Sequence, residues 1–256
     1  MAIIALKAWY LQHYEPIREL EKRPHDLRLS KNSLLKSGLR ADFLDDSEEV
    51  RNSEWFRRYL EGEAVEFYIE GSGGYAISNI DLISHEIYFT KQEVMAQLDP
   101  VIFWSSQTEY PASGDALRDA LTETLNSLNQ RSRLPLTLEE SRRPASEPIR
   151  LGSTSMRKIR RSLLFIADGT PIARVDKKKA PLLLPSPNVC VEMGYALTSK
   201  RTEQILLVKM ERDDLSGQFP FDLPNYQQLL FETPDELQQT LPTVLQNLLQ
   251  RFNILT

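Results

Sequence analysis

A single carboxylate stands in an apolar segment within the stretch LPSPNVCVEMGYAL, residues 184–197. The run from Val189 to Leu197 predicts a short helix that packs on a core, and Glu192 is its one charged residue. A carboxylate near a helix N-terminus has an ordinary use, because it favours the positive end of the helix dipole. Facing a ligand crevice, the same group could act on a bound substrate. Spacing alone leaves both interpretations open, together with plain solvent exposure.

Polar residues also end two strand-like segments. The strand-like segment over residues 100–106 ends in Ser105 and Ser106, and Gln107 follows it directly. Asp168 closes the buried strand expected over residues 162–170. Because ligands of parallel sheets bind beyond the carboxyl ends of the strands, we expect these groups to share a crevice with Glu192 and to hold a phosphate or a ribose. The ordinary alternatives are a polar loop and, for Asp168, a turn residue.

The composition narrows the classes of partner. A formal net charge of -5 argues against direct nucleic-acid binding. The single cysteine excludes an internal disulfide and fits a reducing compartment, so we expect a cytoplasmic protein. Three histidines, all within residues 1–98, give neither a structural zinc site nor a Ser-His-Asp triad with the residues above, so no metal is expected. No apolar run reaches the length of a membrane span, and no signal peptide is expected.

The chain is expected to have two parts, with a break near residues 97–101. Residues 1–98 predict a small α+β region, polar and irregular, with one helix over residues 47–62 and strands joined by tight turns over residues 64–90. The GSGG sequence at 71–74 lacks the ending of a phosphate loop, so a hairpin turn is expected there. Regulation, sensing and oligomerisation all stay open as roles for this region.

Residues 99–256 alternate short apolar strands with amphipathic helices. Strands are expected over residues 100–106, 162–170, 203–210 and 226–232, with a further one in LPLTLEES. Helices are expected over residues 113–130, 153–162, 188–197 and 233–252. This alternation is typical of an α/β fold, in which helices cover both faces of a parallel sheet.

Four segments between residues 100 and 252 share an order with one known family. They read VIFWSSQTEYPASGDALRDALTETLN, LGSTSMRKIRRSLLFIADGTPI, LPSPNVCVEMGYAL and FPFDLPNYQQLLF. Together they resemble the bacterial TIR-like (Toll/interleukin-1 receptor-like) nucleotide-binding family, and the Asn-Val-x-x-Glu-x-Gly-Tyr-Ala piece is the most specific match. The resemblance implies a flavodoxin-like parallel sheet of about five strands flanked by helices. It also implies NAD+ as a substrate rather than a cofactor, and a role in anti-phage defence.

The resemblance also implies roles for single residues. Carried over by position, Glu192 is the carboxylate needed to cleave the bond between nicotinamide and ribose, by stabilising the ribose cation or bonding the ribose hydroxyls. Trp104 is expected near the rings of the substrate. The implied substrate-binding residues are Trp104, Ser105, Ser106, Gln107, Asp168, Asn188 and Tyr195. Activity in such effectors usually needs assembly, so we expect a homo-oligomer on activation.

Two other functions fit the same residues. The PNV…E.GYA pattern also resembles nucleoside 2-deoxyribosyltransferase-like proteins, which use a glutamate on a similar helix to attack a deoxyribose carbon. A non-catalytic module for nucleotide binding or assembly is the third alternative. The chain departs from the TIR-like pattern after the first strand, where Ser-Ser-Gln replaces Trp-Gln and Trp104 stands one place earlier. The stretch 139–152, which should contain a gating or assembly loop, does not align closely.

Overall fold

The computed structural model describes residues 5–30, 39–92, 95–141, 153–177, 180–220, 224 and 227–255. Most of the stretch 139–152 therefore lies outside the described residues. The chain divides into two compact units, Met1–Leu98 and Asp99–Thr256, and this division falls at the expected break. Within the described residues, no helix is both long enough and apolar enough to cross a membrane.

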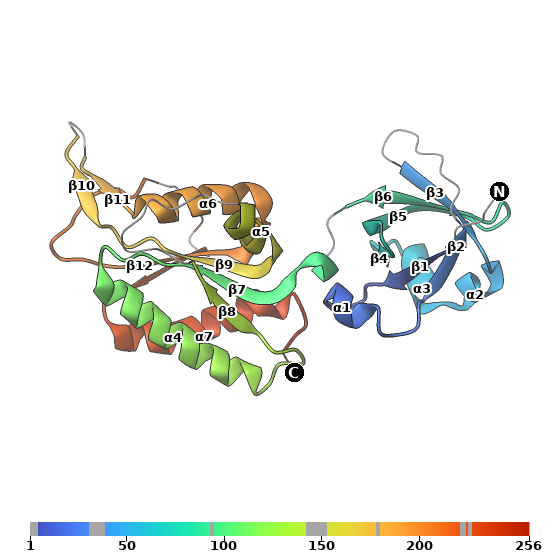
Figure 1. Ribbon diagram of the computed structural model, residues 1–256, viewed down its shortest axis with the longest axis horizontal. Helices are drawn as coiled ribbons and strands as arrows, with labels where there is room; N and C mark the ends of the chain where they lie inside the picture. Colours follow the sequence, from blue (N-terminus) through green and yellow to red (C-terminus); the bar gives the residue numbers. More distant parts are fainter. Residues whose placement is uncertain are drawn as a thin grey trace. The chain divides into compact units, whose positions relative to one another are not determined.

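The first unit is a closed antiparallel barrel with strand order β1-β2-β3-β6-β5-β4 (Figure 1). The strands are β1 (Ala5–Tyr10), β2 (Leu27–Ser30), β3 (Leu39–Leu44), β4 (Glu66–Ile69), β5 (Gly73–Asp81) and β6 (Glu86–Lys91). Its short helices are α1 (Ile17–Leu20), α2 (Ser47–Asn52), α3 (Glu54–Leu60) and the 3-10 helix η1 (Met95–Gln97). Alternate strand residues, among them Phe67 and Phe89, fill one apolar core.

Two expectations for this unit are corrected. The described residues of this unit are not irregular, because their six strands pair with one another into a closed barrel. The single helix expected over residues 47–62 is two helices. Ser53 separates them, since its backbone is extended (ψ 147°) and its side chain caps α3 by accepting from the N–H of Phe56. The hairpin turn at GSGG is confirmed, with Gly71 at positive φ between β4 and β5 and Gly73 at positive φ as the first residue of β5.

The second unit is an α/β layer structure with a five-stranded parallel sheet. Its sheet strands are β7 (Asp99–Ser105), β8 (Thr137–Glu140), β9 (Ser162–Asp168), β12 (Ile205–Met210) and β13 (Gln228–Phe231). A separate hairpin is formed by β10 (Ala173–Val175) and β11 (Leu182–Leu184). Across the sheet the order is β8-β7-β9-β12-β13, which in chain order is 2-1-3-4-5. This is the order of flavodoxin-like doubly wound sheets.

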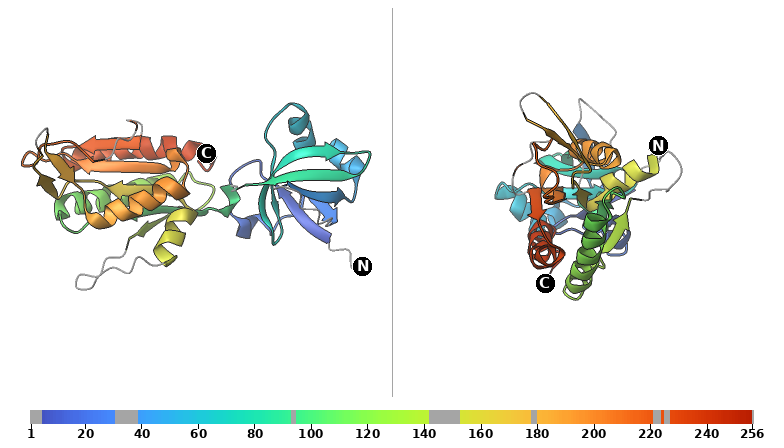
Figure 2. Two further views of the ribbon diagram at one scale, coloured as in Figure 1. Left: turned by 90° about the horizontal axis from the view of Figure 1, so that it is seen from above. Right: turned by 90° about the vertical axis from the view of Figure 1, so that its left-hand side faces the viewer.

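Helices cover both faces of this sheet, as the alternation of elements predicts (Figure 1; Figure 2). One face is covered by α4 (Pro111–Asn129) and α7 (Pro234–Gln250), and the other by α5 (Ser153–Arg161) and α6 (Pro187–Ser199). Every residue of β9 is buried, because it lies in the middle of the sheet between the two helix layers. A 3-10 helix, η2 (Thr202–Gln204), occupies the start of the strand expected from residue 203.

Side chains alternate between the two faces along β7. Phe103 packs with the core beneath α5 and α6, whereas Trp104 lies under α4, whose Arg118 guanidinium is 5.3 Å from the ring centroid. Successive side chains of a strand point to opposite faces, so Ser105 returns to the α5/α6 face. The face that each residue occupies decides which of the expected site residues can meet.

Candidate functional site

Glu192 lies in the second turn of α6 and faces the sheet. The residue is buried, with 6 % of its surface exposed. Its Oε1 accepts a hydrogen bond of 2.6 Å from the hydroxyl of Ser141, and its Oε2 accepts one from the hydroxyl of Ser105. The two serines therefore hold one carboxylate oxygen each.

The strand order explains how three distant residues meet in this serine–glutamate clamp of Ser105, Ser141 and Glu192. Ser105 is the last residue of β7, and Ser141 follows β8 directly. The N–H of Ser141 donates to the carbonyl oxygen of Trp104 at 2.9 Å, which extends the pairing of β8 with β7 by one step. Because α6 follows β9 on the other side of β7, its glutamate reaches the carboxyl end of both strands. This edge is where doubly wound sheets bind ligands.

Asp168 belongs to a different polar cluster, on the α4 face of the sheet. It is fully buried; its Oδ2 accepts from the hydroxyl of Ser113 at 2.7 Å, and its Oδ1 accepts from the N–H of Thr170 at 3.0 Å. The amide of Gln107 donates to Ser113 Oγ at 3.1 Å and closes the cluster. Burial raises the pKa of Asp168, although hydrogen bonds from Ser113 and Thr170 act against it.

The expectation of one shared crevice is therefore corrected for Gln107 and Asp168. Alternation along β9 places Ala167 against the core of α5 and α6, and it turns the next residue, Asp168, toward α4. The side chains of Gln107 and Asp168 make their hydrogen bonds with other residues of the protein. The α4-face cluster of Gln107, Ser113, Asp168 and Thr170 joins the loops after β7 and β9 and acts as internal structure.

Trp104 also lies away from the clamp. Its side chain is fully buried on the α4 face, so it offers no surface to a ligand in this structure. Its indole N–H is buried and has no hydrogen-bond acceptor among the described residues. The cause is again the strand alternation, because Trp104 precedes Ser105 by one position. The expectation that it packs near the rings of a substrate does not agree with this position.

The remaining expected residues lie close to the clamp in sequence or in space. Ser106 is buried and its hydroxyl donates to the carbonyl oxygen of Ser141 at 3.4 Å, a long bond next to the clamp. Asn188 is half-buried in the first turn of α6. Tyr195 is half-buried and packs against the core beneath α6. Of the expected set, only Ser105 contacts Glu192 directly through a hydrogen bond between described side chains.

Side chains at the same sheet edge hold the neighbouring loops together. The hydroxyl of Ser186, the N-cap residue of α6, donates to a carboxylate oxygen of Glu109 at 2.8 Å. Arg212, after β12, donates to the carbonyl oxygen of Pro171 at 2.9 Å and lies 4.1 Å from the ring centroid of Tyr110. Its guanidinium also pairs with Asp214. These contacts connect the loops that follow β7, β9 and β12.

The sequence reasoning missed Ser113, Ser141 and Arg212. For Ser141 a signal was present, because it directly follows an expected strand, the rule that selected Ser105. For Ser113 and Arg212 no local pattern exists. Each is defined by partners on other strands or loops, at 55 residues from Asp168 and 41 residues from Pro171.

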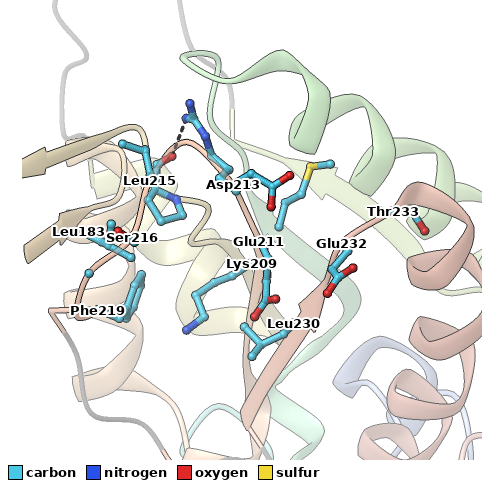
Figure 3. Close-up of a pocket in the computed structure, with 14 residues that line it drawn as sticks. Leu183, Lys209, Glu211, Asp213, Leu215, Ser216, Phe219, Leu230, Glu232 and Thr233 are labelled. Atoms are coloured by element: carbon cyan, nitrogen blue, oxygen red, sulfur yellow. Dashed lines mark hydrogen bonds between the residues drawn. The ribbon is translucent and has the colours of Figure 1, made fainter.

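A pocket of about 750 Å³ opens at the carboxyl ends of β12 and β13 (Figure 3). Lys209 reaches into it and donates to Gln228 Oε1 at 3.0 Å, with its ammonium 4.3 Å from the ring centroid of Phe219. Burial lowers the pKa of Lys209, and the nearby Glu211 acts against this shift. Glu211 and Glu232 are exposed and also line the pocket.

Metal-ligand clusters and the single cysteine are the other candidates for chemistry in this unit. Over the ranges that the structure describes, no group of three or more His, Cys, Asp or Glu side chains could hold a metal ion. Cys190 is half-buried on α6, and burial raises the pKa of its thiol. A nucleophilic cysteine needs the opposite shift. The clamped carboxylate is thus the group whose chemistry has to be explained.

Compared with models of protein families, with curated proteins and with solved structures, the chain has no match. The assignment of a function therefore depends on the quoted sequence segments, on the strand order and on the geometry of the clamp.

Proposed function

We propose that residues 99–256 form a TIR-like domain and that the protein is an NAD+ glycohydrolase with Glu192 as its catalytic carboxylate. One observation carries the proposal: Glu192 is held by the hydroxyls of Ser105 and Ser141 at the carboxyl edge of a 2-1-3-4-5 parallel sheet. Ser105 ends β7, the strand at which this order reverses between β8 and β9. Ligands of doubly wound sheets bind at such switch points.

The proposed reaction is the hydrolysis of the bond between the ribose C1 and the nicotinamide nitrogen. The bonding electron pair leaves with the pyridinium nitrogen, so nicotinamide departs as a neutral molecule. The ribose carbon becomes oxocarbenium-like, and the carboxylate of Glu192 stabilises the positive charge. Water then adds to this carbon and releases one proton. NAD+ and water thus give ADP-ribose, nicotinamide and H+.

The surroundings of Glu192 favour NAD+ over a neutral nucleoside. Glycosidases that expel an oxygen leaving group use a second carboxyl group as a general acid. Asp168, which ends the neighbouring strand β9, faces α4 and bonds Ser113 and Thr170. A neutral nucleobase also leaves more easily when it is protonated, whereas the cationic nicotinamide of NAD+ needs no proton. One carboxylate at the clamp is sufficient for NAD+ alone.

The two serines orient the carboxylate in this proposal. A positioned charge contributes most when it does not reorganise during the reaction, and two short hydroxyl contacts restrict the rotation of Glu192. A buried carboxylate without these donors would lose hydrogen bonds as well as direction. Ser105 and Ser141 are accordingly positioning residues.

We also propose that the protein acts in bacterial anti-phage defence and assembles when it is activated, with the barrel unit as its regulatory part. The support is the resemblance together with the presence of a separate compact unit at residues 1–98. The consumption of NAD+ per molecule should then rise with protein concentration. A rate per molecule that is constant over a wide concentration range contradicts the assembly proposal.

Product analysis separates the proposed function from its alternatives. The purified full chain is incubated with NAD+, and separately with a deoxynucleoside and a free nucleobase. Release of nicotinamide with loss of NAD+ supports the proposal. Exchange of the base on deoxyribose without loss of NAD+ assigns nucleoside deoxyribosyl transfer instead. Self-assembly or NAD+ binding with no turnover in dilute and concentrated protein assigns a non-catalytic module.

A further inference from the structure

One row of paired residues across the sheet connects the clamp with the pocket at β12 and β13. Register pairs Ser105 with Ala167, Ala167 with Leu207, and Leu207 with Gln228. These four residues form one row across four neighbouring strands. Gln228 at its far end accepts the hydrogen bond from Lys209, which lines the pocket.

The row also lies on one face of the sheet. Ala167 and Leu207 belong to the core beneath α5 and α6, and Ser105 bonds Glu192 of α6. Lys209 is two residues beyond Leu207, and the Phe219 ring beneath its ammonium packs on the same core. Neighbouring strands are about 4.8 Å apart, so the two ends of the row are separated by roughly 14 Å. A ribose–diphosphate–ribose backbone spans such a separation.

The charged side chains of the pocket suit the half of a dinucleotide that lies away from Glu192. Lys209 supplies a cation (Figure 3), whereas the guanidinium of the other lining cation, Arg212, pairs with Asp214 and donates to the carbonyl oxygen of Pro171. Glu211 and Glu232 are carboxylates at the ends of neighbouring strands. Their side chains make no hydrogen bond or ion pair with another residue in the described parts of the chain. Carboxylates in dinucleotide sites accept hydrogen bonds from ribose hydroxyls.

We propose that this pocket binds the adenosine half of the dinucleotide and that Glu211 and Glu232 select NAD+ against NADP+. The inference rests on the proposed function, which places the nicotinamide ribose at Glu192. Lys209 faces the diphosphate, and the two carboxylates accept from the adenosine ribose hydroxyls. The exposed Leu230 offers apolar surface to the adenine. A 2′-phosphate in place of the hydroxyl brings added negative charge to the carboxylates, and like charges in contact are strongly disfavoured.

The test compares kcat/KM for NAD+ and NADP+ in the full chain and in the double variant Glu211→Gln/Glu232→Gln. The matched control is Asp235→Asn, an exposed carboxylate in the first turn of α7 that does not line the pocket. We expect the wild type to prefer NAD+ by about tenfold or more. The double variant should lose most of this preference through a gain in NADP+ turnover, and Lys209→Gln should raise KM for both nucleotides while kcat is kept. The control should retain the wild-type ratio.

Equal use of the two nucleotides by the wild type, or an unchanged ratio in the double variant, overturns the selectivity inference while the proposed function stands. If neither nucleotide is consumed, the proposed function fails, and calorimetric titration of NAD+ and NADP+ into the wild type decides the inference separately. Tighter binding of NAD+ that the double variant loses supports it. Equal binding, or no binding of either nucleotide, overturns it.

Discussion

Ser141 and Glu192 are separated by 51 residues in the chain, yet the hydroxyl of Ser141 donates a hydrogen bond of 2.6 Å to Oε1 of Glu192. Ser141 follows the edge strand β8, and Glu192 comes from the helix after the central strand β9. Their contact, together with the one from Ser105, fixes a buried carboxylate at the ligand-binding edge of the sheet. The clamp connects the fold to the proposed chemistry.

Removing one serine of the clamp should lower both turnover and stability. We expect Ser141→Ala to reduce kcat about tenfold or more, because the freed carboxylate leaves its productive orientation. The lost hydrogen bond should cost about 1–3 kcal/mol of unfolding free energy. Rates and urea unfolding are compared with Ser127→Ala, an exposed serine of α4. Unchanged kcat in Ser141→Ala, with the protein folded, contradicts a positioning role.

The raised pKa of Asp168 gives the stability of the protein a specific pH dependence. Because burial raises this pKa in the folded state, the folded protein holds a proton that the unfolded chain releases above about pH 3.8. The contribution of Asp168 to stability is thus complete below that pH and is lost as the pH rises through the raised pKa. In urea unfolding, the stability of wild type minus that of Asp168→Asn should fall over this window. A difference that rises with pH refutes the assignment.

Gly169 should not tolerate a side chain. A Cβ at this position would lie 2.4 Å from Cδ1 of Leu207, a buried side chain in the core beneath α6. We expect Gly169→Ala to cost about 1–3 kcal/mol in unfolding free energy and to cost less in a Leu207→Ala background. Gly194 of α6 is the matched control, because a Cβ there meets no atom within 4 Å. Gly194→Ala should stabilise the protein by about 0.5–1 kcal/mol. Equal effects at the two glycines would show that the close contact at Gly169 is absent.

The position of Trp104 predicts that it does not bind substrate. In Trp104→Phe the buried indole N–H, which has no acceptor among the described residues, is removed while the aromatic packing is mostly kept. KM for NAD+ should stay within about twofold of the wild-type value if ligand contacts are untouched. A large rise in KM with unchanged unfolding free energy would place the indole at the site after all.

The order of the sheet strands and the helices in the second unit was predictable because strands and helices differ in the period of their apolar residues, whereas the hairpin of β10 and β11 was not expected. The buried strand 162–168 and the helix capped by Thr233 are local patterns, and both occur in the structure. Barrel closure in the first unit was not predictable. It depends on the pairing of β1 with both β2 and β4, and no single strand encodes this pairing.

The candidate site was likewise predictable only in part. Glu192 and Ser105 could be selected because one is a lone charge in an apolar helix and the other ends a strand. Their contact, and the exclusion of Trp104 and Asp168 from it, follows from strand alternation in a register that the sequence leaves undefined. A shift of one residue in the start of β7 would exchange the faces of Trp104 and Ser105.

The catalytic role of Glu192 is tested by measuring the release of nicotinamide from NAD+ by the wild type and by Glu192→Gln. The amide keeps the size of the side chain and removes its charge, and Glu123→Gln on the exposed side of α4 is the control. Both dilute and concentrated protein are assayed, because the proposal includes assembly. We expect the wild type and the control to release nicotinamide, whereas Glu192→Gln, shown to be folded by circular dichroism, should lose about a hundredfold or more in rate. Equal rates in wild type and Glu192→Gln would show that Glu192 is not the catalytic carboxylate.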